Sequence, residues 1–233
     1  LCWRPAPNQS LDTDVIRATG NAFSAEGGIR LLEGNLGRSL IKSSAVAPEK
    51  LHIEAPAVVI SHQDELKVLF EQGALEKDCV IVARFQGPSA NGMPELHKLM
   101  PILGVLQDRG HAVALVTDGR LSGASGKVPA AIHVTPEAAK GGVIGLIEDG
   151  DRIQLDVASG VLNVLLDEAV LASRTIPDCP TQPGTVGRGL FAVSRAKVTD
   201  AEQGGCTLFE AVSAASPMVS AEQPAIGAVL HGN

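Results

Sequence analysis

The sequence predicts a mixed β fold with flanking α-helices, and two observations support this class. Two short apolar runs, residues 79–85 (CVIVARF) and residues 111–117 (HAVALVT), each end at a glycine-rich polar loop, and a helical pattern lies between them. Farther along the chain, short apolar runs alternate with Asp-Gly and Ser-Gly turns, which is typical of antiparallel strands. We therefore expect parallel and antiparallel strands together.

The first part of the chain predicts an arm followed by a hairpin. Residues 1–26 combine prolines with polar residues and show no hydrophobic period, so we expect a linker or arm. Residues 29–32 and 40–46 are apolar runs on either side of the sequence GNLG, which favours a turn. Residues 57–61 (AVVIS) predict the next strand.

Two helices are expected around the strand at residues 79–85. Residues 63–75 carry apolar residues at the spacing of a short amphipathic helix. A second helix is expected from Met93-Pro94-Glu95 to Arg109, because apolar residues recur there every three or four positions and proline suits a first helical turn. Glu95 is therefore placed in the first turn of that helix.

The order strand, loop, helix, strand over residues 79–117 favours a right-handed crossover between parallel strands. The loops that follow two parallel strands lie at the same edge of a sheet. We therefore expect Glu95, from the first loop region, to lie beside Ser122, from the second.

The remainder of the chain favours antiparallel strands and loops. Three apolar runs with turns between them predict a meander: residues 141–147, 151–157 and 161–166. Residues 167–174 predict a short helix, and residues 177–189 predict a loop rich in Pro, Gly and Thr. Residues 210–233 are expected to form a mobile tail.

Composition excludes several classes of protein. The 233 residues are 45% apolar and 19% charged, with a net charge of −7 and 3% aromatic residues, which argues against nucleic acid as a partner. No apolar stretch reaches the length of a membrane span. The four cysteines are dispersed and show neither zinc-site nor disulfide spacing: Cys2, Cys79, Cys179 and Cys206. We expect a cytoplasmic protein.

The loop over residues 118–127 is the strongest candidate for chemistry. Its glycines allow close approach of backbone to a ligand, and its polar side chains suit an anion or a hydroxylated substrate: Asp118, Arg120, Ser122, Ser125 and Lys127. The alternative is a solvated turn whose serines bond their own backbone. P-loop and nucleophile-elbow patterns both fail here.

Individual candidates also have ordinary structural explanations. Glu95 suits a hard cation, although a glutamate at a helix start is stabilised by the helix dipole alone. Lys127 suits a phosphate or carboxylate, although many loop lysines are simply solvated. His133, within the apolar AAIHV, is more typical of a core histidine than of a catalytic one.

Four segments, in this order, carry a family resemblance: GGIRLLEGNLGRSLIKSSAV, RFQGPSANGMPEL, TDGRLSGASGKVPAAIHVTPEA and IEDGDRIQLDV. Together they resemble the C-terminal part of the dihydroxy-acid and 6-phosphogluconate dehydratase family, over residues 27–209. The segment SGASGKVPAAIHVTPEA resembles the 6-phosphogluconate branch of that family. The resemblance implies a swivelling β/β/α domain that is built like a β-barrel.

The resemblance also implies a reaction, the dehydration of 6-phosphogluconate to 2-keto-3-deoxy-6-phosphogluconate in the Entner–Doudoroff pathway. It assigns the base that takes the C2 proton to Ser122 and a metal-ligating role to Glu95. It implies an iron–sulfur cluster, of the 4Fe-4S type, and a magnesium ion. We assign the 6-phosphate to Ser125 and Lys127, and keep Asp118 and Arg120 as further substrate-binding candidates.

One departure from the family pattern limits these expectations. The family's cluster cysteines lie in an N-terminal domain, and none of the four cysteines here matches them. We expect this chain, which begins at Leu1, to need that domain, to be inactive alone and to belong to a homodimer when complete. Two alternatives remain: a dehydratase of another sugar acid or of a branched dihydroxy acid, and a stand-alone binding module for an anionic metabolite.

Overall fold

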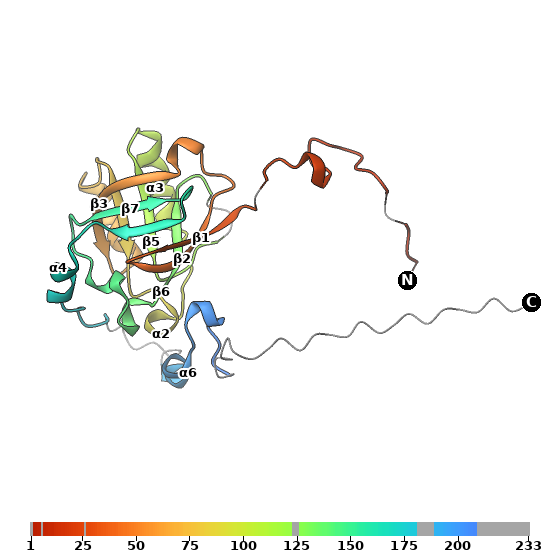
Figure 1. The fold of residues 1–233 in the computed structure, drawn as a ribbon. Helices are drawn as coiled ribbons and strands as arrows, with labels where there is room; N and C mark the ends of the chain where they lie inside the picture. The colour runs from red at the N-terminus through yellow and green to blue at the C-terminus, as the bar shows by residue number, and fades with distance from the viewer. Residues whose placement is uncertain (1, 6, 26, 123–125, 181–188, 209–233) are drawn as a thin grey trace, which may run out of the picture.

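The computed structural model describes residues 2–5, 7–25, 27–122, 126–180 and 189–208. Within these residues, strands form one closed barrel in the order β1-β2-β6-β5-β4-β3-β7-β8 (Figure 1). Their bounds are β1 (Ile29–Gly34), β2 (Gly37–Lys42), β3 (His52–Ile60), β4 (Cys79–Ala83), β5 (Val113–Thr117), β6 (Ala130–Thr135), β7 (Arg152–Asp156) and β8 (Val161–Val164). The predicted mixed β fold of barrel type is confirmed.

Strand directions divide the barrel into two parts. The β3–β4, β4–β5 and β5–β6 pairs are parallel. The β1–β2, β2–β6, β3–β7 and β7–β8 pairs are antiparallel. A parallel contact between Glu33 of β1 and Val161 of β8 closes the barrel. The parallel part contains the crossover that the sequence predicts, and the antiparallel part contains the predicted hairpin.

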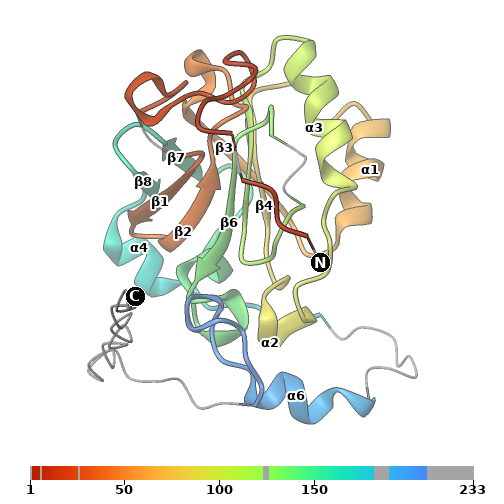
Figure 2. The same ribbon diagram turned by 90° about the vertical axis from the view of Figure 1, so that its right-hand side faces the viewer.

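The described helices lie on one flank and at one end of the barrel (Figure 2). Their bounds are α1 (Gln63–Glu71), α2 (Pro88–Asn91), α3 (Leu99–Asp108), α4 (Glu168–Ser173) and α6 (Ala192–Lys197). Helices α1 and α3 lie side by side against the parallel strands, while α2 and α6 lie together at the end where β4 and β5 finish. Short 3-10 turns complete the fold: η1 (Thr19–Asn21), η2 (Pro48–Lys50), η3 (Ala138–Lys140), η4 (Val143–Leu146) and η5 (Ala201–Gln203).

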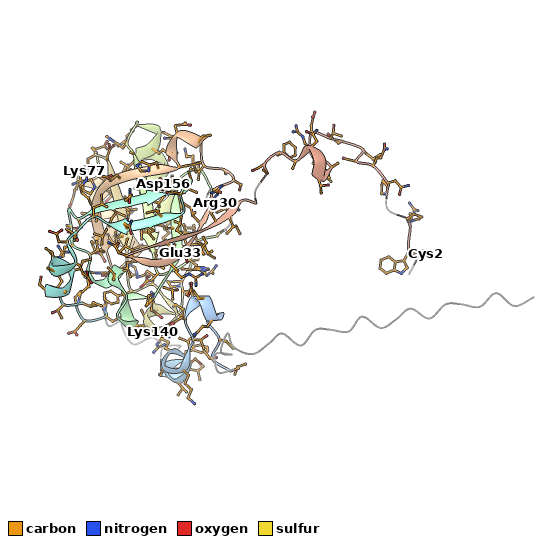
Figure 3. All side chains as sticks on the ribbon, in the orientation of Figure 1. Cys2, Arg30, Glu33, Lys77, Lys140 and Asp156 are labelled. Carbon is orange, nitrogen blue, oxygen red and sulfur yellow. The ribbon has the colours of Figure 1, made fainter. Side chains whose placement is uncertain are left out.

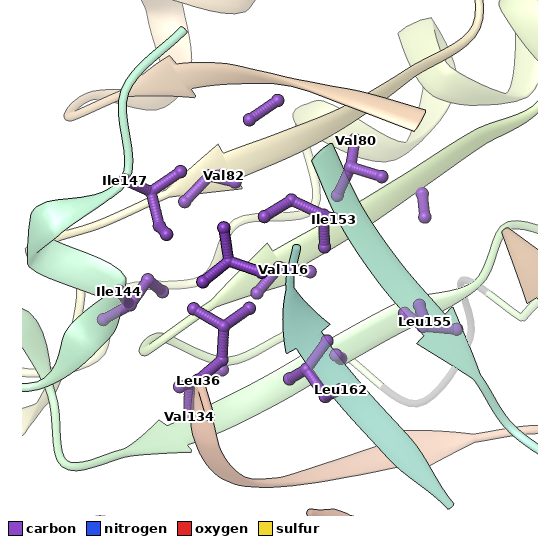
Figure 4. Close-up of a cluster of buried hydrophobic side chains, with 14 of the residues drawn as sticks. Leu36, Val80, Val82, Val116, Val134, Ile144, Ile147, Ile153, Leu155 and Leu162 are labelled. Carbon is purple, nitrogen blue, oxygen red and sulfur yellow. The ribbon is translucent and has the colours of Figure 1, made fainter. Parts of the chain in front are cut away.

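Two apolar cores explain why the parallel strands are continuously hydrophobic. In β4, Val80 and Val82 point into the barrel, where they pack with Val116 of β5 (Figure 4). The alternate residues Cys79 and Ile81 point outward into a second core beneath α1 and α3. Because both faces of these strands are buried, no polar alternation is needed.

The predicted helix over residues 93–109 begins later than expected. Helix α3 starts at Leu99, and Glu95 instead forms an isolated parallel β-bridge with Arg120. Met93 adopts a left-handed conformation with φ of 53°, which is incompatible with a helix starting there. The placement of Glu95 in a helical first turn was therefore wrong.

Two further strand predictions need correction. Residues 141–147 are not a strand, because Val143–Leu146 forms a 3-10 turn. Gly142, just before this turn, lies too close to the backbone of Pro136 for any side chain to fit. Strand β6 (Ala130–Thr135) was not predicted, since the sequence before it reads as the end of a glycine-rich loop. It is the strand that joins the parallel part of the barrel to the hairpin.

The N-terminal arm extends away from the barrel, as Figure 1 shows for the described residues before β1. The predicted tail, residues 210–233, lies outside the described residues. In the described part of the chain, no helix is both long and apolar enough to cross a membrane.

Candidate functional site

The predicted meeting of Glu95 and Ser122 is confirmed. Strands β4 and β5 pair in parallel, so the segments that follow them leave the barrel at the same end. The Ser122 backbone N–H donates a hydrogen bond to Glu95 Oε1 at 2.8 Å. Ser122 is exposed, and the Glu95 side chain retains 30% of its accessible surface, so both face solvent.

Arg120 completes the surroundings of the Glu95 carboxylate. Its Nη1 lies 3.2 Å from Glu95 Oε2, and its Nε donates to the Met93 carbonyl at 3.1 Å. Each carboxylate oxygen of Glu95 therefore has a donor from residues 120–122. These contacts orient the carboxylate and leave lone pairs for a further partner.

Asp118 does not line the site, contrary to its selection as a substrate-binding candidate. It is fully buried, and its carboxylate accepts hydrogen bonds from the backbone N–H groups of Phe85, Gln86 and Ala138 at 2.8–3.1 Å. Burial raises the pKa of Asp118 from 3.8 to about 6, although the three N–H donors oppose that shift. A ligand on the surface has no access to this carboxylate.

Lys127 lies near Ser122 but has a partner on α3. Its Nζ donates to both oxygens of Asp108, at 2.7 and 2.8 Å. Lys127 also lines an open depression of about 840 Å³ that contains Glu95, Ser122, His97 and Met100, which we call the helix-side pocket. The other phosphate candidate, Ser125, lies outside the described residues.

A second, smaller cavity lies on the other side of Ser122. It has a volume of about 280 Å³, and Ser122, Leu40, Leu121, Ile132 and His133 are among the residues that line it; we call it the strand-side pocket. Because Ser122 lines both pockets, it stands at the boundary between them.

His133 is the residue of this region that sequence reasoning set aside. It is half-buried rather than in the core, and burial together with the charge of Arg120 lowers its pKa, so that the imidazole is neutral near pH 7. Its backbone φ is 58°, a conformation uncommon for residues other than glycine. No sequence pattern indicated this, since the apolar AAIHV is typical of an ordinary core segment.

Strained backbone converges on the segment 118–120. Within the described residues, the non-glycine residues with positive φ are Phe85, Met93 and His133. Phe85 donates to Asp118, the Met93 carbonyl accepts from Arg120, and the His133 N–H donates to the Gly119 carbonyl at 2.9 Å. Such conformations are costly and persist where surrounding contacts enforce them, typically at functional sites.

The described residues contain no group of three or more His, Cys, Asp or Glu side chains that could hold a metal ion. Cys79 is buried beneath the helices, and burial raises its pKa to about 11, which disfavours the thiolate that a cluster needs. Cys2 lies far out on the N-terminal arm, as Figure 3 shows, while Cys179 is exposed and Cys206 is partly exposed. Glu95 supplies one hard oxygen ligand at most.

Comparisons with known proteins find similar sequences over most of the chain. Residues 14–205 match the family described as dihydroxy-acid/6-phosphogluconate dehydratase C-terminal. The chain is 54% identical to phosphogluconate dehydratase of Pseudomonas aeruginosa over 215 residues, which are 91% of this chain and 35% of that protein. The corresponding Escherichia coli K12 protein is also 54% identical, over 90% of this chain and 35% of its own length. A dihydroxy-acid dehydratase of Helicobacter hepaticus is 38% identical over 73% of this chain.

Proposed function

This chain belongs to the dihydroxy-acid/6-phosphogluconate dehydratase family, and from that membership we propose that it forms the C-terminal part of a hydro-lyase acting on 6-phosphogluconate. The product is 2-keto-3-deoxy-6-phosphogluconate, an intermediate of the Entner–Doudoroff pathway of gluconate metabolism. The chain spans about 35% of the length of the phosphogluconate dehydratases that it matches, so the complete activity requires the rest of such an enzyme. We propose residues 27–209 as the unit that contributes to it.

The observation that carries the proposal is the Ser122–Glu95 contact beside Lys127, in a chain so similar to phosphogluconate dehydratases. A polyhydroxy acid phosphate needs a base at C2, a site for its carboxylate and a site for its phosphate. The helix-side pocket offers a serine hydroxyl, an oriented carboxylate and a lysine in one place. Greater identity to the phosphogluconate enzymes than to the dihydroxy-acid enzyme favours the phosphorylated substrate.

Ser122 is the base in this proposal. Its alkoxide oxygen takes the C2 proton, the electrons of the C2–H bond form a C2–C3 double bond, and hydroxide leaves C3. The proton removed from C2 is in net the one that converts this hydroxide to water, and the enol becomes the 2-keto acid when its hydroxyl proton is lost and C3 is protonated. A serine hydroxyl is a weak base in water, so its alkoxide needs nearby positive charge. Arg120, which lies against Glu95 at the same loop, supplies part of that charge.

Glu95 fits a magnesium site as a single ligand. Magnesium prefers hard oxygen donors in octahedral geometry and commonly uses one or two carboxylates together with substrate oxygens. The Ser122 N–H and Arg120 orient the Glu95 carboxylate, as outer partners of metal ligands do. The other ligands would come from the substrate and from outside the described residues.

The cysteines of this chain do not fit an iron–sulfur cluster, because Cys79 is buried as a thiol and the others are dispersed. The family resemblance nevertheless implies a 4Fe-4S cluster that would act as a Lewis acid on the leaving C3 hydroxyl. We propose that its ligands belong to the part of such enzymes that this chain does not match. We also propose a cytoplasmic homodimer for the complete enzyme.

The test is dehydration of 6-phosphogluconate by the full-length protein, with gluconate and a branched dihydroxy acid as competing substrates. Ser122→Ala should abolish turnover while the metal content stays unchanged, because the proton acceptor alone is lost. Ser173→Ala, at an exposed serine of α4, is the matched control and should retain activity. Appreciable turnover by Ser122→Ala would remove Ser122 as the base, and preference for a non-phosphorylated acid would favour the other branch of the family.

A further inference from the structure

Two buried carboxylates lie behind the site and contact no described cation through an ion pair. Asp118 is 0% exposed and Glu137, just after β6, is 3% exposed. Asp118 accepts hydrogen bonds from the N–H groups of Phe85, Gln86 and Ala138. Glu137 accepts them from the N–H groups of Ser89 and Ala90, at 2.9–3.2 Å. Burying a carboxylate is costly unless hydrogen bonds compensate it, so these acids have a specific use.

Both carboxylates accept hydrogen bonds from the segment that connects β4 with Glu95. Asp118 holds the two residues at the start of this segment, and Glu137 holds the first turn of α2 in its middle. Gly87 lies between these two attachments, and a side chain there would meet the Glu137 carboxylate at 2.3 Å. At the far end of this segment, the Met93 carbonyl accepts a hydrogen bond from Arg120 Nε.

Asp118 also joins the segment to the loop that carries Ser122, whereas Glu137 joins it to the turn after β6. Asp118 directly follows β5 and is four residues before Ser122. Its Oδ2 accepts from both Phe85 and Ala138, so one atom links the segment after β4, the segment after β5 and the turn after β6. The relative placement of Glu95 and Ser122 therefore depends on groups that touch neither of them.

Other nearby charges do not replace this role. Arg84 is close enough to Asp118 for their charges to interact, but its guanidinium donates to the carbonyls of Gly145 and Ile147. Glu137 is the other charged group that faces Asp118, and its like charge disfavours ionisation of Asp118. Both acids thus act as acceptors for backbone N–H groups rather than as members of salt bridges.

We propose that Asp118 and Glu137 are positioning residues, which hold the Glu95 segment against the Ser122 loop and govern the reaction without contacting the substrate. The kinetic part of this inference rests on the proposed function, whereas its structural part does not. A displacement of about 1 Å in a catalytic arrangement can cost roughly 100-fold in rate. These buried hydrogen bonds are therefore expected to affect kcat more than KM.

The structural test is amide hydrogen exchange on the full-length protein. Asp118→Asn and Glu137→Gln each keep one acceptor oxygen and replace the other with an NH2 group, which cannot accept from a backbone N–H. Both variants should speed exchange in peptides covering residues 84–96 and also in peptides covering residues 119–122. Asp151→Asn is the matched control, because Asp151 is a buried carboxylate that contacts Glu148 and Arg174 instead, and both site peptides should keep their wild-type exchange. Unchanged exchange around Ser122 in both variants would overturn the proposal.

The kinetic test uses the same variants with 6-phosphogluconate. We expect kcat to fall about 10- to 100-fold, with KM within about threefold of wild type, and Glu137→Gln to retain more activity than Glu137→Ala. Wild-type kcat in a variant whose exchange is altered would overturn the positioning role. If the wild-type protein itself does not act on 6-phosphogluconate, the proposed function fails, and the exchange result alone decides whether the two carboxylates join the two loops.

Discussion

Lys127 and Asp108 illustrate how one residue can be paired and still be available to a substrate. Their side chains are 54% and 67% exposed, and exposed ion pairs of this kind are worth about 1 kcal/mol or less. A phosphate offers two negative charges and three acceptor oxygens, so it competes well for the lysine. The ion pair therefore holds Lys127 at the helix-side pocket, and a phosphate can still replace Asp108 as its partner.

Replacing Lys127 tests this assignment directly. We expect Lys127→Gln in the full-length protein to raise the KM for 6-phosphogluconate about 10- to 100-fold, since hydrogen bonds to charged groups are worth about 1.5–3 kcal/mol. The KM for gluconate should stay unchanged. Lys67→Gln, at an exposed lysine of α1 that is also paired with an acid, is the control. Equal losses with both substrates would show that Lys127 does not bind the phosphate.

Asp118 predicts an unusual pH dependence of stability. Its pKa is about 6 in the folded protein and 3.8 in the unfolded chain, so the folded state binds the proton more tightly. Protonation therefore favours folding: the contribution of Asp118 to the free energy of unfolding rises as the pH falls from about 6 to 4. With about 1.4 kcal/mol per pKa unit, this change is on the order of 2–3 kcal/mol.

Denaturant unfolding of the wild type and Asp118→Asn between pH 4.5 and 7.5 measures this contribution. The stability advantage of the wild type over the variant should grow toward low pH. A difference that is independent of pH would contradict the raised pKa. His133 acts in the opposite direction, because its pKa is lowered on folding, but both proteins contain it and its effect cancels in the comparison.

At the scale of elements, the parallel strands were predictable and their surroundings less so. Strands β4 and β5 are buried at every position because one face lines the barrel interior and the other packs against the helices. Their parallel pairing brought Glu95 and Ser122 together even though the start of the intervening helix was predicted wrongly. The sheet-edge rule depends on strand direction alone, and so it tolerated that error.

The surroundings that the sequence did not predict depend on contacts between distant segments. Asp118 has the sequence context of a loop aspartate, yet backbone groups from residues 85, 86 and 138 surround it in the fold. His133 lies in an apolar run, whereas its position near Arg120 and in the lining of the strand-side pocket depends on how β6 pairs with β2 and β5. Local sequence patterns contain no information about such long-range partners.

Gly119 tests how tightly the two loops pack. A side chain at this position would meet Gln86 Cβ at 2.7 Å and Leu96 Cδ1 at 3.0 Å, so alanine requires one loop to move. We expect Gly119→Ala to destabilise the protein by about 1–3 kcal/mol, the usual cost of overpacking. Gly20→Ala is the control, because nothing lies within 4 Å of the added group. Thermal unfolding compares the two, and equal melting temperatures would show that the loops are loosely packed.

At the scale of the whole molecule, the proposed site has an exposed serine and one candidate metal ligand, and the described residues contain no group of three or more metal-binding side chains. The barrel contributes rigid placement: closure leaves no free strand edge, and two cores hold β4 and β5 from both sides. Such a scaffold suits the presentation of a serine and a carboxylate to chemistry supplied elsewhere. This division agrees with a chain that spans about 35% of the relatives' length.

The division predicts the behaviour of the isolated chain of residues 1–233. Incubated with iron and sulfide under reducing conditions, it should show no cluster absorbance and release no 2-keto-3-deoxy product, because its one buried thiol resists ionisation and its other cysteines are dispersed. The full-length protein treated identically should gain both, which controls for the reconstitution. Iron-dependent turnover by the isolated chain would contradict the division, since the serine, the carboxylate and the Lewis acid would then all belong to this chain.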